Sequence, residues 1–139
     1  MEDKAVLISI HPGYTEKILS GEKRLEFRRS WVVRPVKYMV IYATSPIQRI
    51  VAVAEIKEVY SGTRARLWSL AMEKGGGISR RKLFSYLADS KNPVAIELTN
   101  IKQLESGLDP KDLFGSNFRP PQSFCYLKED VLSQITEIL

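Results

Sequence analysis

The segment from His11 to Arg29 constrains the fold more than any other part of this 139-residue chain, because it must turn, form a helix and begin a strand within nineteen residues. The His-Pro-Gly sequence at its start ends any preceding strand, since proline lacks an N–H donor and glycine accepts positive φ. Residues 15–20 then predict a short helix, and Gly21 is placed to adopt the left-handed conformation that ends it. Residues 23–29 alternate between apolar and charged side chains, which predicts a strand.

This predicted strand carries its charges on one face. Leu25 and Phe27 point one way, whereas Arg24, Glu26 and Arg28 point the other way. A face of this kind can bind an anion. Its charges can also simply pair with one another in solvent, where exposed ion pairs contribute little to stability. The segment alone leaves both alternatives open.

The rest of the chain predicts a mixture of strands and helices. Apolar or alternating runs rich in β-branched and aromatic residues predict strands at residues 5–10, 38–43, 50–59, 93–99 and 123–127. Leucines at helical spacing, with Thr63 and Ser79 as N-caps, predict helices at residues 63–74 and 79–87. An amphipathic pattern of leucines and isoleucines predicts a helix at residues 129–139. Residues 102–117 lack a sustained period, apart from one helical turn near Asp109.

This order of elements predicts one α+β domain over residues 1–139, built on a small mixed, mostly antiparallel β-barrel with flanking helices. The side chains expected to point inward are Leu25, Phe27, Val40, Val53, Ile96 and Phe124.

The composition excludes several classes of protein. The single cysteine, Cys125, excludes an intramolecular disulfide and a multi-cysteine zinc site, and its apolar neighbours predict a buried thiol. With one histidine and one cysteine, we expect no metal and no cofactor. No apolar run reaches membrane-spanning length, and the charged first residues do not resemble a signal peptide. We therefore expect a cytoplasmic protein that does not bind membranes.

The net charge of +5 is unevenly distributed. Residues 64–82 hold six Lys and Arg side chains and one carboxylate, whereas residues 97–139 hold four cations and seven carboxylates. A domain with one basic side suits a polyanionic partner. A merely basic, well-solvated surface would show the same pattern, so charge alone leaves both alternatives open.

Two further features have ambiguous chemistry. His11 is the residue that a Ser-His-Asp or Cys-His site would require, but it lies beside Pro12 at a turn, and a structural hydrogen bond is its favoured role over that of a general base. Gly75, Gly76 and Gly77 lack the lysine and hydroxyl of a phosphate-binding loop and predict a hinge or a flexible loop.

Four segments, in this order, resemble the ASCH domains, a branch of the PUA-like superfamily. They are the helix and Gly-x-Lys strand that continues to Arg29, the Tyr-Ala-Thr-Ser-Pro sequence at residues 42–46, the alternating strand at residues 51–59 and the Pro-Pro-Gln-Ser-Phe sequence at residues 120–124. The resemblance covers most of the chain. It implies a PUA-like barrel with a ligand cleft beside the Gly-x-Lys strand.

The candidate ligand-binding residues combine this implied cleft with the charged strand and the basic helix. They are His11, Lys23, Arg24, Glu26, Arg28, Arg29, Tyr42, Ser45, Arg80, Arg81, Lys82, Gln122 and Ser123. Arginine forks suit phosphates and base edges. Tyr42, Trp31 and Tyr38 could offer a stacking face, although core packing is the favoured role for most of these aromatic residues.

The resemblance also implies catalytic candidates. Some single-domain relatives are amidohydrolases that act on acetylated cytidine, and their motif has a lysine followed three residues later by a threonine. Lys23 matches the lysine, but Glu26 stands at the threonine position and more naturally forms an ion pair. The candidates are therefore Lys23 with Glu26 or Glu55, and Glu26 is expected to keep Lys23 protonated and suited to an anion.

The favoured hypothesis is a module that binds nucleic acid, with RNA as the expected partner, or a modified nucleotide, without turnover. One alternative is a small hydrolase, either a nucleoside amidohydrolase or a ribonuclease, that uses Lys23 with a carboxylate. Another is an accessory regulator whose partner is a protein. The sequence leaves open RNA, DNA or free nucleotide as the ligand, and it leaves open whether there is turnover.

Overall fold

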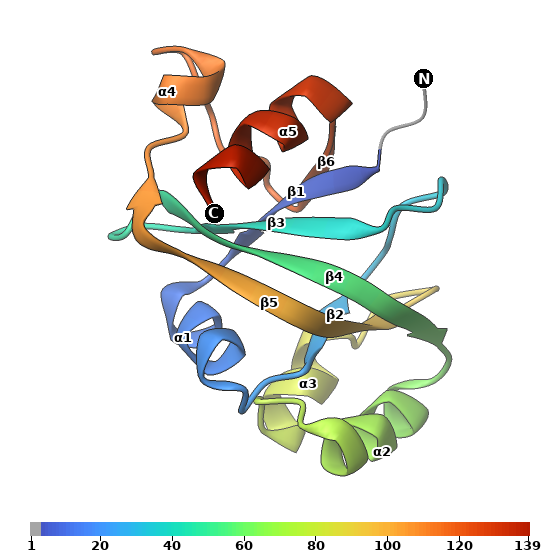
Figure 1. The fold of residues 1–139 in the computed structure, drawn as a ribbon. Coiled ribbons are helices and arrows are strands. Elements are labelled where there is room, and N and C mark those ends of the chain that lie inside the picture. Colours follow the sequence, from blue (N-terminus) through green and yellow to red (C-terminus); the bar gives the residue numbers. More distant parts are fainter. Residues whose placement is uncertain (1–3) are drawn as a thin grey trace.

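The fold of residues 4–139, described by a computed structural model, is a six-stranded sheet that curls into a half-barrel and is flanked by helices (Figure 1). The strands are β1 (Ala5–Ile10), β2 (Leu25–Arg28), β3 (Tyr38–Ala43), β4 (Arg49–Ser61), β5 (Val94–Leu108) and β6 (Phe124–Leu127). They lie in the order β2-β5-β4-β3-β1-β6. The pair β1–β3 is parallel, and the remaining neighbours are antiparallel. This arrangement confirms the predicted α+β class and its mixed, mostly antiparallel sheet.

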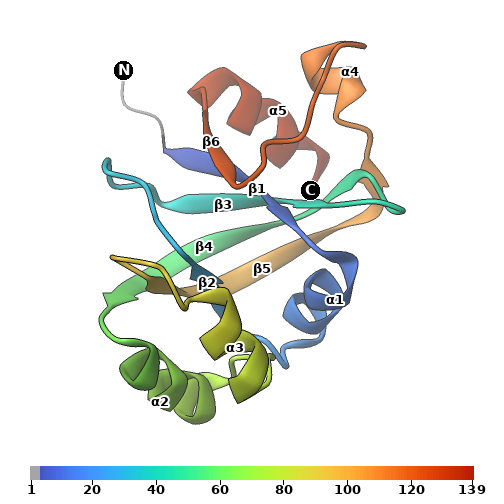
Figure 2. The same ribbon diagram turned by 180° about the vertical axis from the view of Figure 1, so that it is seen from behind.

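Helices cover both sides of the sheet. They are α1 (Pro12–Ser20), α2 (Arg64–Lys74), α3 (Arg80–Tyr86), α4 (Lys111–Phe114) and α5 (Glu129–Ile138). Figures 1 and 2 show α4 and α5 on one side and α1, α2 and α3 on the other. None of the helices within residues 4–139 is long and apolar enough to cross a membrane.

The apolar core follows this division. Leu132 and Ile135 of α5 pack on one side of the sheet against strand residues such as Leu7 and Val40. On the other side, Ile18 of α1 joins the face formed by β1, β3, β4 and β5. The leucines of α2 and α3 cover a third cluster, which includes Leu25 and Phe27 of β2 and Ala95 of β5. Ala95 lies between Val94 and Ile96 of the second cluster, so the third cluster packs on the opposite face of β5.

Local sequence signals set the ends of the helices near β2. The His11 side chain caps α1, Pro12 occupies its first turn, and Gly21 ends it with a φ of 87°. Thr63 and Ser79 cap α2 and α3 through their hydroxyls, as the sequence predicts.

Two sequence predictions differ from the structure. The strand predicted at residues 93–99 continues to Leu108, because a positive φ at Asn100 and three register shifts against β4 interrupt the alternation that would reveal it. The buried-thiol prediction for Cys125 is wrong: the side chain is exposed, because β6 forms an edge of the sheet.

Candidate functional site

The charged face of β2 forms the floor of a cavity. Glu26 and Arg28 pair with Ile96 and Val94 of β5, so their side chains project from the same face of the sheet. Lys23 precedes the first paired residue of β2, and its backbone N–H donates to the carbonyl of Lys17 in α1. Because the strand pleat does not extend to Lys23, its side chain reaches the same face as Glu26.

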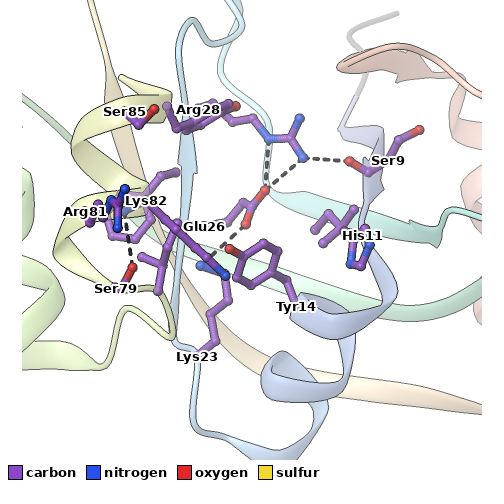
Figure 3. Close-up of a pocket in the computed structure, with 14 residues that line it drawn as sticks. Ser9, His11, Tyr14, Lys23, Glu26, Arg28, Ser79, Arg81, Lys82 and Ser85 are labelled. Atoms are coloured by element: carbon purple, nitrogen blue, oxygen red, sulfur yellow. Dashed lines mark hydrogen bonds and ion pairs between the residues drawn. The ribbon is translucent and has the colours of Figure 1, made fainter. Parts of the chain in front are cut away.

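Glu26 lies between two cations, and all three side chains are buried. Its Oε2 accepts from Nε of Arg28 at 3.0 Å and from Nη2 at 2.8 Å. Its Oε1 lies 3.8 Å from Nζ of Lys23. Nη2 of Arg28 also donates to the Ser9 carbonyl at 2.7 Å, which ties the strand β2 to β1. Figure 3 shows this chain of contacts running across the floor of the cavity.

The surroundings of Lys23 shift its pKa in two opposite directions. Its Nζ donates to the Gly76 carbonyl at 2.7 Å and lies 4.9 Å from the ring centre of Phe27 and 5.2 Å from that of Tyr14. Burial lowers the pKa of Lys23 below its ordinary value, and this effect outweighs the neighbouring carboxylate of Glu26, which raises the pKa. The sequence shows the neighbouring carboxylate of Glu26 but not the burial of Lys23, which shifts the pKa the other way. The expectation that Lys23 is protonated therefore stays a prediction.

Two helices form the walls of the cavity, which has a volume of about 640 Å³. His11 and Tyr14 of the α1 segment lie on one side, and Arg81, Lys82 and other α3 residues lie on the opposite side (Figure 3). The volume falls within the range of small-molecule sites. The cavity thus combines a buried, ion-paired floor with exposed cations and aromatic walls.

His11 has a structural role in this wall. Its Nδ1 accepts from the backbone N–H of Gly13 at 3.1 Å, which caps α1. In the neutral ring the proton must then lie on Nε2, so Nε2 is a donor in this tautomer and not a proton acceptor. The structural hydrogen bond expected from the sequence is present.

The structure brings six of the thirteen predicted ligand residues to the cavity: His11, Lys23, Glu26, Arg28, Arg81 and Lys82. Ser123 lies beside this group, with its Oγ 3.5 Å from Nη1 of Arg28. The exposed residues Arg24, Arg29, Ser45 and Gln122 do not line the cavity.

Three other candidates have different surroundings. Tyr42 is buried on the α5 side of the sheet, where its ring packs on Phe118, and burial with nearby Asp109 raises the pKa of Tyr42. Arg80 places its guanidinium 4.2 Å from the ring centre of Phe84. Glu55 accepts from the Asn100 side chain at 3.2 Å and does not line the cavity with Lys23.

Several cavity residues escape the sequence predictions, including Ser9, Tyr14, Ser79, Ser85 and Tyr86. Helical periodicity gives a signal for the last three, since residues three or four positions from Lys82 share its face of α3. Tyr14 gives no such signal, because its place depends on how α1 packs against the sheet.

The three consecutive glycines form a loop, one of the two alternatives predicted from the sequence, and the backbone of this loop is closely packed. The Gly75 carbonyl accepts from the backbone N–H groups of Arg24 and Leu25, and the Gly76 carbonyl accepts from Lys23. A Cβ at Gly77 would lie 2.6 Å from the Cβ of Lys23. The glycines therefore permit the close approach that holds Lys23 in place.

No group of three or more His, Cys, Asp or Glu side chains arranged to hold a metal ion occurs within residues 4–139. The cavity lining offers several kinds of reactive or hydrogen-bonding side chain. These are two buried cations that share a carboxylate, exposed cations, hydroxyls and aromatic rings.

Comparison with known proteins supports the resemblance noted in the sequence. No family profile matches the chain. A Zymomonas mobilis protein named ASCH domain-containing ribonuclease is 26% identical over 137 residues, which span 97% of this chain and 92% of that protein.

Solved structures show the same fold. The crystal structure of ASCH from Zymomonas mobilis superposes with a TM-score of 0.86 and 24% identity, covering 98% of this chain and 96% of that one. The N-terminal domain of Staphylothermus marinus McrB superposes with a TM-score of 0.59 at 8% identity, covering 99% of this chain and 95% of that one. The fold therefore persists where little sequence identity remains.

Proposed function

This chain has the fold of an ASCH domain, and we propose that it binds RNA, or a modified nucleotide, in the cavity between α1 and α3. The observation that carries the proposal is the buried chain of Lys23, Glu26 and Arg28 at the floor of a cavity that exposed cations line. Burying three ionised groups costs free energy that apolar residues of similar size would avoid. Such a network at the floor of a cavity is therefore a candidate for recognition.

Each part of the cavity suits one part of a nucleotide. Tyr14 and Tyr86 offer aromatic surfaces on which a base can stack. Glu26 Oε1 lies 3.8 Å from Nζ of Lys23, and a carboxylate oxygen with two lone pairs can also accept from a base amino group. Arg81 and Lys82 lie at the exposed side, where they can neutralise phosphates.

The charge distribution agrees with this orientation. The basic window of residues 64–82 spans α2 and the start of α3, which lie in the same half of the molecule as α1 and the cavity (Figures 1 and 2). The acidic carboxyl-terminal region contains α4 and α5, on the other side. A polyanion approaching the protein is therefore attracted to the cavity side.

Two adjacent arginines of α3 allow a matched test. Arg81 lines the cavity, whereas Arg80 packs over Phe84 and does not. We expect Arg81→Gln to weaken the binding of a single-stranded RNA and to reduce the slope of log affinity against log salt by about 0.7, the value for one phosphate on a single strand. Arg80→Gln removes the same charge and should leave the slope closer to that of the wild type. Equal effects of the two variants would exclude the cavity as the binding site.

RNA cleavage is a second candidate function. The Zymomonas mobilis relative is named a ribonuclease, and burial lowers the pKa of Lys23. A neutral lysine can donate one N–H to the Gly76 carbonyl and use its lone pair to accept a proton from a ribose 2′-hydroxyl. This role requires the deprotonated amine, so the rate should rise with pH.

Lys23→Met separates the two functions, because it keeps the volume of the side chain and removes the amine. We expect this variant to lose RNA cleavage, measured on end-labelled single-stranded RNA, while circular dichroism shows the fold retained. Cleavage at an unchanged rate would exclude Lys23 as the base. If the wild type cleaves neither RNA nor acetylated cytidine at any pH, the binding function alone is supported.

The finer sequence-based hypotheses stay predictions. They are the action on acetylated cytidine, a regulatory role through a protein partner, the cytoplasmic location and the organisation of residues 1–139 as one domain.

A further inference from the structure

A second hollow adjoins the cavity. It has a volume of about 560 Å³, and it shares five lining residues with the cavity: His11, Tyr14, Ile78, Ser79 and Lys82. Lys17, Gly13 and Gly77 line the second hollow and not the cavity. The two spaces therefore lie side by side along these five residues, with the buried floor in the cavity and Lys17 in the second hollow.

The linings of the cavity and of the second hollow differ in charge. The lining of the cavity includes the carboxylate of Glu26 and aromatic rings. The ionisable side chains that line the second hollow are His11, Tyr14, Lys17 and Lys82, without a carboxylate among its lining residues. The first lining suits a base, which has both donors and acceptors, whereas the second suits a phosphate.

Lys17 is held at the mouth of the second hollow by weak contacts. Its Nζ lies 3.3 Å from the Gly77 carbonyl and 3.6 Å from the Glu22 carboxylate, and its side chain is 44% exposed. The Glu22 side chain is 62% exposed, so water screens their ion pair and a phosphate can replace it at little cost. The same ammonium lies 5.9 Å from the ring centre of Tyr14, next to the aromatic wall that both spaces share.

From this arrangement, and resting on the proposed function, we propose that the two spaces are successive subsites for single-stranded RNA. One base enters the cavity beside Glu26, and the phosphate that links it to the next nucleotide lies in the second hollow between Lys17 and Lys82. The preferred ligand is then an oligonucleotide and not a free nucleoside, because a nucleoside leaves the second subsite empty.

Titration calorimetry with ligands of increasing size tests this proposal. The probes are the four ribonucleosides, their 3′- and 5′-monophosphates, and the corresponding dinucleotides, all at one ionic strength. A charge-assisted contact contributes enough free energy for a change of roughly tenfold or more in affinity. We expect at least one monophosphate series and the dinucleotides to bind roughly tenfold more tightly than the nucleosides.

Lys17→Gln should remove this gain while it leaves the affinity for nucleosides unchanged. Lys102→Gln is the matched control, since Lys102 is an exposed lysine of β5 outside both spaces. Nucleosides that bind as tightly as dinucleotides, or a phosphate gain that Lys17→Gln retains, would overturn the two-subsite arrangement and leave nucleotide binding intact. If no nucleoside, nucleotide or oligonucleotide binds, both proposals are overturned.

Discussion

Arg28 connects more parts of the site than any other side chain on the cavity floor. Its guanidinium contacts Glu26 on its own strand, the Ser9 carbonyl on β1 and the Ser123 hydroxyl just before β6. Strands β2 and β6 lie at opposite edges of the sheet order, so these contacts draw the two edges toward each other through side chains and not through backbone pairing. A planar fork with several donors can serve three acceptors at once, whereas a lysine presents a single ammonium.

Replacing Arg28 with methionine should therefore destabilise the fold strongly. The change leaves the buried Glu26 with only the longer contact to Lys23, and breaking a buried ion pair from one side costs about 3–5 kcal/mol. Urea unfolding at neutral pH measures this loss. Arg29→Met is the control, since the neighbouring Arg29 is exposed and should change stability by less than about 0.5 kcal/mol.

A second comparison separates the ion pair from packing. The triple variant Lys23→Met, Glu26→Gln and Arg28→Met removes all three buried charges and should recover part of the lost stability. If Arg28→Met costs no more than Arg29→Met, the network is not a structural element of the folded state.

At this scale the sequence predicts which residues share a face but not what covers that face. The alternation in residues 23–29 correctly places Glu26 and Arg28 together. Their burial depends on α1, which directly precedes β2, and on α3, which comes from a distant part of the chain. A solvated charged face and a cavity floor have the same local pattern, so residue-level periodicity leaves the two indistinguishable.

Among the elements, the glycine loop between α2 and α3 positions the site most directly. Its carbonyls accept from Lys17, Lys23 and the first residues that lead into β2. A run of glycines in a sequence indicates conformational freedom, but here the missing side chains allow backbone and Lys23 to pack closely. The backbone of this loop therefore supports the cavity floor through its contacts with Lys23 and the start of β2.

Two glycines with left-handed backbones offer a matched test of this packing. Gly77 has a φ of 63° and no room for a Cβ, whereas Gly21 has a φ of 87° and open space around the same position. Alanine at either residue meets the strain of positive φ, about 1–2 kcal/mol. Gly77→Ala should cost a further 1–3 kcal/mol or so from overpacking against Lys23. If the two variants lose equal stability in thermal or urea unfolding, the loop shifts to accommodate the added Cβ at Gly77 without a further cost.

Local sequence patterns predict where helices begin and end, but they do not predict the length of β5. The helix caps at Thr63 and Ser79 and the stop at Gly21 depend on single residues and their immediate neighbours, and each occurs as predicted. The second half of β5 depends on its pairing with β4, whose register shifts remove the expected alternation. Bulges therefore hide long strands from a sequence pattern while they let the sheet curl.

For the whole molecule, the order of strands and helices predicts the fold class well. Most of the side chains expected in the core are also buried. Of the six side chains expected to point inward, Leu25, Phe27, Val40, Val53 and Ile96 are buried. Phe124 is only partly buried because β6 is an edge strand, and it packs against the Trp31 ring at 5.1 Å. The other edge strand, β2, is fully buried because α2 and α3 pack on Leu25 and Phe27, so the elements that cover an edge strand decide its burial.

A second buried carboxylate connects the sheet to α2, far along the chain from the cavity floor. Glu97 of β5 accepts from the Tyr60 hydroxyl of β4 at 2.8 Å and lies 3.7 Å from both Lys57 and Lys74. Burial alone would raise the pKa of Glu97. The Tyr60 hydrogen bond and the cations Lys74, Lys57 and Arg24 lower it, and the net direction is downward.

This lowered pKa predicts how the stability of the whole protein depends on pH. In the unfolded chain Glu97 takes up a proton near the ordinary glutamate pKa of about 4.3, whereas in the folded protein it stays ionised to lower pH. The stabilisation from Glu97 is thus present above that value and is lost as the pH falls through the folded-state pKa.

Glu97→Gln should therefore be less stable than the wild type at pH 7, and the difference should shrink below about pH 4. Urea unfolding at pH 7, 5 and 3 measures this, with Glu58→Gln as the exposed control. A difference that stays constant across this range would contradict an ionised, paired Glu97 in the folded protein.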